Sequence, residues 1–530
     1  MSQETSWGIM KKLMSDSKTL KGYVLRIKLW LESRRFFVWT MVFFYFESIW
    51  MALSANYPQA FDENFHFGLI KIYAHYWLPF LTSQPPNAAA YGAVARDPSY
   101  LYHYLMSFPY RLISVFIHSQ AGQVISLRLI DIALFGFGLI LFRKVIKKTR
   151  TSDALTNISI FLFILIPIVP QLAAHINYDD LIFPMTAGMC LLTFRLYDEI
   201  KSHKVNAKTL LYFLSLGFIG TQTKYAFATI FAGAIVFILF SAYRAYHHKP
   251  WKSITKPLTS SWKKLSIIRR LLLATLLVIS IGLFVQRDGL NLITYHTFTP
   301  NCSKVVSVSS CQQYGPWGAN NRRHSRIINS PQPVKYENPL FYLGSWLYWM
   351  WYRSFFAING PNAGYTNYPP LPLPAVAAIM IFLAGIITFA VQRKRIFKNN
   401  PYLIFFGLVV GFYVIALMVD GYAQYRYTDV LVAMNGRYLL PILLLVAAIA
   451  GRGFSIALRY RPVRKAMIAS LAVILFLEGG GFLTFLTRSN ASWDWPNKIV
   501  INVNDTARKI ISPAILKGSK SVHSVIRMFD

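Results

Sequence analysis

Long apolar blocks, separated by short polar stretches, run through most of the chain. Many approach the roughly 20 residues that an α-helix needs to cross the hydrocarbon core of a bilayer. Hydropathy places about eleven such blocks, which predicts an all-α polytopic membrane protein. The expected spans are 36–55, 124–142, 156–174, 181–197, 210–223, 226–241, 271–286, 373–392, 402–420, 437–451 and 466–486.

Two apolar segments can be assigned to membrane spans in more than one way. The run 210–241 is long enough for one span, but a turn near Lys224 divides it into two. The segment 101–118 is interrupted by His103, Pro109 and Arg111, so we expect a helix that lies along the membrane surface. Any other assignment of these two segments would move later basic stretches to the opposite side of the membrane.

The distribution of Lys and Arg gives the expected orientation. A formal net charge of +34 would by itself suit a nucleic-acid-binding protein. However, 34 of the 55 Lys and Arg, but only 6 of the 21 Asp and Glu, fall in six stretches on one side of the expected spans. This is the positive-inside bias of a membrane protein, and it excludes a basic nucleic-acid-binding face. The stretches are 1–35, 143–155, 195–209, 242–270, 393–400 and 452–465.

The same arrangement predicts three regions. Residues 1–35 form a basic cytoplasmic segment without a cleavable signal peptide, 36–486 the transmembrane domain, and 487–530 an external tail. The external loops 56–123 and 287–372 stand out, because long ordered loops are usually functional. We therefore expect a multi-pass protein of the cytoplasmic membrane, with its N-terminus inside and the lipid bilayer around it.

The second external loop contains Cys302 and Cys311, two of the three cysteines. Disulfides persist on the external side of the cytoplasmic membrane, whereas Cys190 is expected within a span. We predict a short Cys302–Cys311 bridge, and two free thiols are the alternative.

The first external loop opens with an unusual cluster of ionisable groups. Asp62 and Glu63 are adjacent carboxylates, and His66 follows within one helical turn. A carboxylate beside a surface of low dielectric constant gains proton affinity, which suits a general base. The alternative is a solvated loop in which Asp62 caps the following helix.

Other polar groups are expected on the same external face. They are Tyr178, Asp179 and Asp180 after the third span, Lys224 in the turn, Arg128 and Asp131 one helical turn apart in the second span, and Arg437 and Tyr438 at the start of the tenth. Arg128 and Asp131 could form a structural pair, but ionisable residues at membrane depth are functional candidates because their desolvation is costly. Bases could hold a phosphate while a carboxylate activates a hydroxyl nucleophile.

Other motifs narrow the function. The chain has neither a P-loop nor a dinucleotide-binding glycine pattern, so a nucleotide-driven machine is disfavoured. Its histidines show no paired metal-binding spacing, so the sequence identifies no definite cofactor. A divalent metal ion near Asp62, Glu63 and His66 is a weaker alternative.

The order of these parts resembles that of GT-C glycosyltransferases: one span, then a long external loop that opens with Asp-Glu, then many more spans. The segment 61–68 is similar to the Asp-Glu…His start of the protein-mannosyltransferase-like and DUF2142 branches. Residues 177–180, 223–225 and 436–441 resemble later DUF2142 elements. The resemblance covers approximately 36–450, through short motifs that occur in the same order.

The resemblance implies an enzyme that transfers a sugar, with inversion, from a polyprenyl-phosphate carrier to an acceptor outside the membrane. It implies that Asp62 is the general base, supported by Glu63 and His66. Arg128 matches the arginine that contacts the lipid phosphate, and Lys224 and Arg437 are expected to add to that site. The substrate-binding candidates are Tyr178, Asp179, Asp180 and Tyr438.

Three functions follow as expectations. The first is a cell-envelope glycosyltransferase whose acceptor is a glycan, lipid, polymer or protein. The second is a transporter or flippase of lipid-linked glycans, which would use the same charges along a path. The third is a non-catalytic scaffold, for which Asp62 and Arg128 would be dispensable.

Overall fold

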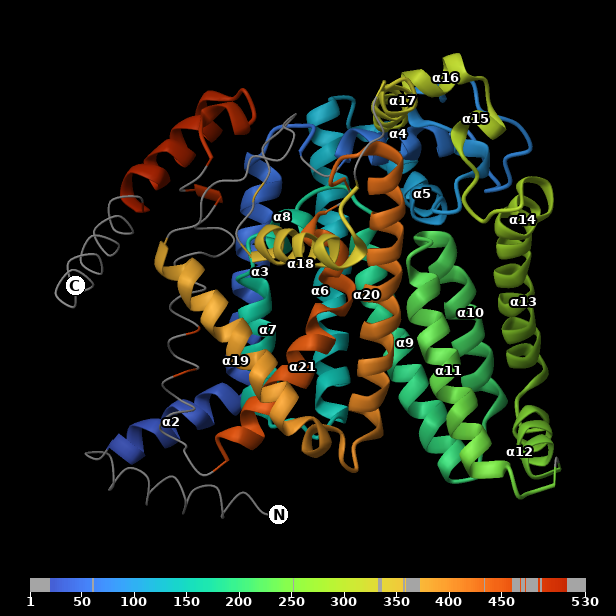
Figure 1. Ribbon diagram of the computed structural model, residues 1–530, viewed down its shortest axis with the longest axis vertical. Helices are drawn as coiled ribbons and strands as arrows, with labels where there is room; N and C mark the ends of the chain where they lie inside the picture. Colours follow the sequence, from blue (N-terminus) through green and yellow to red (C-terminus); the bar gives the residue numbers. More distant parts are fainter. Residues whose placement is uncertain are drawn as a thin grey trace.

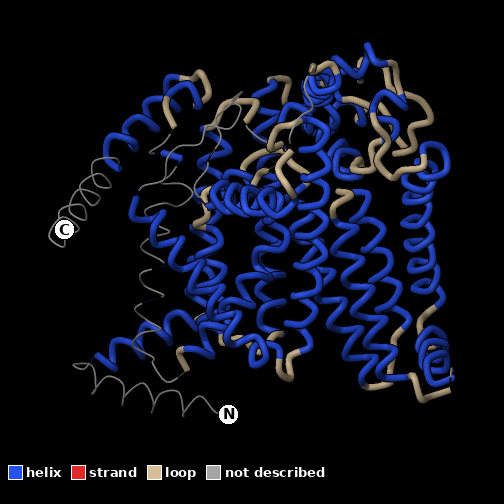
Figure 2. The backbone as a smooth tube through the Cα atoms, in the orientation of Figure 1, coloured by secondary structure: helices blue, strands red, loops and turns tan. Residues whose placement is uncertain are grey.

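The architecture is entirely helical in the part of the chain that the structure describes (Figures 1 and 2). A computed structural model describes residues 20–59, 62–250, 252–331, 336–355, 358, 372–432, 434–459, 468, 472, 485–486 and 489–511. Within these residues the single β-type contact is an isolated bridge between Ala55 and Asp494.

The helices differ in length and direction. In chain order the longer ones are α2 (Leu20–Glu32), α3 (Arg34–Ser54), α4 (Glu63–Tyr73), α5 (Leu101–Phe116), α6 (Gln120–Lys148), α7 (Asp153–Ile164), α8 (Ile168–Ala173), α9 (Asp179–Lys201), α10 (Ala207–Thr223), α11 (Phe227–Tyr246), α12 (Lys252–Lys263), α13 (Ile267–Phe284), α14 (Leu290–Tyr295), α16 (Val308–Gln313), α17 (Gly315–Ile328), α18 (Pro339–Phe355), α19 (Pro372–Phe397), α20 (Pro401–Thr428) and α21 (Leu440–Ala457).

Six helical segments in the described ranges are long and apolar enough to cross a membrane, which supports a polytopic membrane protein. They are Arg34–Ser54, Gln120–Lys148, Phe227–Tyr246, Ile267–Tyr295, Pro401–Thr428 and Gly436–Ala457. Most of the expected span 466–486 lies outside the described residues. The run 210–241 is two helices, α10 and α11, with the turn at Lys224 as predicted.

Two expected boundaries are wrong. The span expected at 156–174 is divided into α7 and α8, because Pro167 and Pro170 have no N–H to continue the helical hydrogen bonds. The span expected at 271–286 continues to Tyr295 through a π-helical turn at Val285–Gly289. Arg287 and Asp288, expected in an external loop, are therefore buried helical residues.

The basic connections gather at one end of the bundle and the two long loops at the other. In Figure 1 the α11–α12 and α19–α20 connections lie at the lower end, whereas α4, α5, α16 and α17 lie at the upper end. Helix α18 crosses the long helices at an angle and packs Trp346 and Met350 against α20. The ionisable candidates of the first loop therefore lie at the end opposite the basic connections.

An aromatic core holds the first spans together beneath that upper end. The Phe183 ring of α9 stacks on Phe135 of α6 and Phe163 of α7, with ring centroids 4.3 and 5.5 Å apart. Phe44 of α3 also stacks on Phe135, with ring centroids 5.6 Å apart. Offset stacking and burial of such rings stabilise the contact, so these four helices form a firm base for the segments above them.

The segment after the last expected span returns to the end of α3. The Trp495 N–H donates to Ser54 O, and the Asn56 N–H donates to Trp493 O. Asp494 forms an ion pair with Arg508 at 2.8 Å and accepts a hydrogen bond from Asn504. Residues 489–511 thereby fix the point at which the chain leaves α3 toward Asp62.

Candidate functional site

Asp62 is the exposed member of the acidic pair. It occupies the N-cap position of α4 in the left-handed conformation, with φ 68° and ψ 29°. Its side chain makes no capping hydrogen bond, so the alternative that it caps the helix is wrong. Aspartate tolerates this conformation better than most residues, and here it turns a 57% exposed carboxylate away from the helix.

Arg437 forms an ion pair with the Asp62 carboxylate. Its Nη2 lies 2.9 Å from Asp62 Oδ2, and its side chain is only 5% exposed. Arg437 is the second residue of a short 3-10 turn, η4 (Gly436–Leu439), and its backbone N–H donates to the Asn435 side chain that caps the turn. The guanidinium also lies 5.2 Å from the Tyr438 ring centroid. Residues far apart in sequence thus form one acid–base pair at the upper end.

A second, more buried ion pair lies close to the first. Lys224 Nζ is 2.5 Å from Asp179 Oδ1, and both side chains are almost fully buried. The ammonium also lies over the rings of Tyr178 and Tyr438, at 4.5 and 5.2 Å. Burial lowers the pKa of Lys224, and the Asp179 carboxylate partly offsets that effect. Because Tyr438 contacts both Arg437 and Lys224, the two cations belong to one site.

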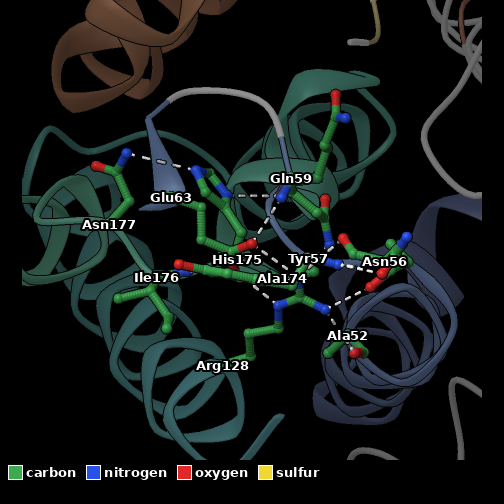
Figure 3. A network of polar contacts seen from close by, with 12 residues as sticks. Ala52, Asn56, Tyr57, Gln59, Glu63, Arg128, Ala174, His175, Ile176 and Asn177 are labelled. Atoms are coloured by element: carbon green, nitrogen blue, oxygen red, sulfur yellow. Dashed lines mark hydrogen bonds and ion pairs between the residues drawn. The ribbon is translucent and has the colours of Figure 1, made fainter. Parts of the chain in front are cut away.

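Glu63, unlike Asp62, is completely buried. Figure 3 shows it within a network of polar contacts that includes Arg128. It accepts two hydrogen bonds from Arg128, Nε to Oε1 at 2.8 Å and Nη2 to Oε2 at 2.7 Å. It also accepts the N–H groups of Gln59 and Ile176. Burial alone raises the pKa of Glu63, but the Arg128 pair and these donors hold it below its ordinary value.

Arg128 has no donor left for a ligand. Besides Glu63, its guanidinium donates to the carbonyl oxygens of Ala52, Ala55 and Asn56 at the end of α3. It is 0% exposed. All five N–H groups are therefore used within the protein, and the arrangement gives Arg128 a structural role rather than the expected contact with a lipid phosphate.

The suggested pairing of Arg128 with Asp131 is also wrong. Asp131 accepts a hydrogen bond from Tyr102 at 2.8 Å instead. Asp180 is fully buried, and among the described residues neither of its carboxylate oxygens has a hydrogen-bond partner. Among the substrate-binding candidates, Tyr178, Asp179 and Tyr438 therefore lie at the Lys224–Arg437 site, whereas Asp180 faces the protein interior.

His66 pairs with His103, which the sequence marked only as an interruption of the apolar segment 101–118 and not as a site residue. His66 Nδ1 lies 2.8 Å from His103 Nε2, and the rings stack 5.1 Å apart. Burial lowers the pKa of both, that of His103 to about 3. Asp62, Glu63 and His66 thus face three different partners, and no group of three or more His, Cys, Asp or Glu in the described ranges could hold a metal ion.

The predicted Cys302–Cys311 disulfide is present. It precedes Tyr314, whose ring lies 5.7 Å from that of Phe65 on α4. Burial, with a further contribution from the Asp62 carboxylate, raises the pKa of Tyr314. The second loop therefore reaches the site formed by the first. No sequence pattern distinguishes Tyr314 from the other 30 tyrosines, and His103 is noticeable in the sequence only as a polar residue in an otherwise apolar segment.

The site combines an exposed carboxylate with two buried cations that aromatic rings surround. An exposed carboxylate can accept a proton from a bound hydroxyl group, and buried cations favour an anionic ligand. No family model matches the chain, and comparisons with curated proteins and with solved structures find no similar protein.

Proposed function

We propose that this protein is a GT-C-type membrane glycosyltransferase that transfers a hexose or pentose, with inversion, from a polyprenyl-phosphate carrier to an acceptor outside the cell membrane. In this proposal the chain forms a bundle of about eleven spans with its N-terminus inside. The two long loops, with their surface helices, lie outside. The motifs at 61–68, 177–180, 223–225 and 436–441 support the family, through residues that meet at one site.

The observation that carries the proposal is the Asp62–Arg437 pair beside Lys224. A polyprenyl-phosphate donor needs a cationic site for its phosphate and a base for the acceptor, both at the membrane surface. Arg437 and Lys224 supply the charge, with Tyr438 in contact with both. Asp62 supplies the exposed carboxylate.

The transfer step uses these groups in turn. The donor phosphate takes hydrogen bonds from Arg437, which releases the Asp62 carboxylate toward the acceptor. Asp62 accepts the hydroxyl proton while the acceptor oxygen attacks the anomeric carbon. The bond between that carbon and the phosphate oxygen breaks, and its electron pair leaves with the polyprenyl phosphate. Arg437 and Lys224 stabilise that anion, so no general acid is needed.

Glu63, His66 and Arg128 act indirectly in this proposal. Glu63 and Arg128 fix the start of α4 against the end of α3. The His66–His103 pair ties the same helix to α5. These contacts hold Asp62 where the chain turns outward, so the three residues position the base and do not touch the substrate.

A second candidate is a transporter or flippase of lipid-linked glycans. It is favoured by Asp131 and Asp180, two fully buried carboxyl groups with oxygens that have no hydrogen-bond partner in the part of the chain that the structure describes. Such groups are typical of proton-coupled transport.

One experiment separates the two functions. Purified protein in liposomes is supplied with a labelled polyprenyl-phosphate sugar and a crude acceptor fraction from the cell envelope. The proposal expects free polyprenyl phosphate and labelled acceptor in equal amounts. Movement of the intact labelled lipid between leaflets, without release of polyprenyl phosphate, would instead establish the transporter.

A further inference from the structure

Helix α12 and the start of α13 form a strongly basic region far from the candidate site. Residues 242–270 contain eight Lys and Arg and no Asp or Glu. Figure 1 shows α12 at the lower end of α13, running across the direction of the long helices. A helix in that direction lies along a membrane surface when the long helices cross the membrane.

The two faces of α12 differ in chemistry. Ile254 and Leu258 pack against the apolar core, and the Ser261 hydroxyl accepts the N–H of Ala207 at the start of α10. Lys252 and Lys256, one turn apart, project from the other side with Lys263, because a helix turns about 100° per residue. All three lysines are exposed, and no ion pair joins them to a carboxylate in the described part of the chain.

An exposed aliphatic strip continues from this basic face. Ile267, Ile268 and Leu271 begin α13 and are 61–67% exposed. In the segment Ile267–Tyr295, only 17% of the most apolar 18-residue stretch is buried within the protein. This is the smallest buried share among the six candidate spans. Arg270 holds the turn between the two helices by donating to the carbonyl oxygens of Lys263 and Leu265. The lysines of α12 therefore lie next to an exposed aliphatic surface that can contact the hydrocarbon chains of lipids.

We propose that α12 and the start of α13 form a binding site for an anionic phospholipid. The lysines of α12 contact the headgroup phosphate, and its acyl chains lie along Ile267, Ile268 and Leu271. A nucleic acid would supply the negative charge but would not cover the aliphatic strip. Each lysine near an anionic membrane surface contributes roughly fivefold to the affinity.

The test uses full-length protein reconstituted in phosphatidylcholine with a small amount of spin-labelled lipid. Electron paramagnetic resonance measures the association of spin-labelled phosphatidylglycerol relative to spin-labelled phosphatidylcholine. We expect a preference for phosphatidylglycerol that falls about fivefold or more in the triple variant Lys252→Gln, Lys256→Gln and Lys263→Gln. The matching Lys→Arg triple variant should retain the preference, because it keeps the charge.

A matched control removes the same charge at the other end of the bundle. Lys304→Gln, Arg322→Gln and Arg326→Gln change three exposed cations and should leave the preference intact. An unchanged preference in the α12 triple variant, or an equal loss in the control, would overturn the site. Displacement of labelled phosphatidylglycerol by a polyprenyl phosphate at lower mole fractions than by unlabelled phosphatidylglycerol would overturn the assignment to a phospholipid.

Discussion

Arg128 of α6 and Glu63 of α4 form a two-pronged ion pair in which both side chains are 0% exposed. The remaining Arg128 donors hold the carbonyl oxygens at the end of α3. The end of α3 and the start of α4, which follow each other along the chain, therefore meet the more distant α6 at one guanidinium. The pair that looked like part of a ligand site from the sequence instead fixes the backbone that leads to Asp62.

Arg128→Ala should destabilise the protein. It leaves a buried, unpaired carboxylate and three carbonyl oxygens without donors, a loss of about 3–5 kcal/mol. We expect a lower thermal unfolding temperature in detergent, measured by the loss of helical circular dichroism. The double variant Arg128→Ala, Glu63→Gln should recover part of the loss because no charge remains unpaired. A stable Arg128→Ala protein that specifically loses donor binding would contradict the structural role and would indicate that Arg128 contacts the lipid phosphate.

Asp62→Asn should abolish transfer and leave the fold intact. The carboxylate is 57% exposed and makes no capping bond, so stability changes little. Loss of the base should lower kcat by about 100-fold or more. The measurement is the release of polyprenyl phosphate by reconstituted protein. Asp153→Asn removes a carboxylate that is 41% exposed at the other end of the bundle and serves as the control. Full transfer by a folded Asp62→Asn protein would contradict the proposed role of Asp62 as the general base.

Arg437→Gln should weaken donor binding more than it changes turnover. The variant removes a charged donor from the proposed phosphate site, which corresponds to roughly 10-fold or more in the KM for the donor. Arg437→Lys retains the charge but loses the planar fork, so it should fall between the wild type and Arg437→Gln. Steady-state kinetics against donor concentration provides the measurement. An unchanged KM in both variants would exclude Arg437 from the phosphate site.

Acid should destabilise the protein through its buried histidines. Burial depresses the pKa of His103 to about 3 and that of His175, a fully buried residue between α8 and α9, to about 4, against about 6.5 in an unfolded chain. Between pH 6.5 and 4 the unfolded state therefore binds more protons, and stability falls as pH falls. Each group contributes up to ~1.4 kcal/mol per pH unit.

The measurement is the unfolding temperature between pH 7.5 and 4.5. His103→Asn should flatten this pH dependence, since one of the titrating groups is absent. His247→Asn, which changes an exposed histidine at the basic end, should follow the wild-type profile. A wild-type profile that is flat from pH 7 to 5 would contradict the burial of neutral imidazoles at the site.

The sequence by itself determined the helical membrane class, the clustering of bases at one end and the turn at Lys224. Each depends on local composition or on spacing along the chain, and a span is recognised because the bilayer sets its length. The Cys302–Cys311 bridge was predictable for a similar reason, because only two cysteines share the expected external side.

Only the tertiary structure decided which charges meet. Asp62 and Glu63 are adjacent in sequence but one is exposed and the other buried, because the left-handed backbone at Asp62 turns one carboxylate outward while Arg128 holds the other inside. Arg437 reaches Asp62 across most of the chain, and His103 meets His66 from a helix that looked apolar. Partners of buried charges are chosen by desolvation and geometry in three dimensions, and hydropathy along the chain contains neither.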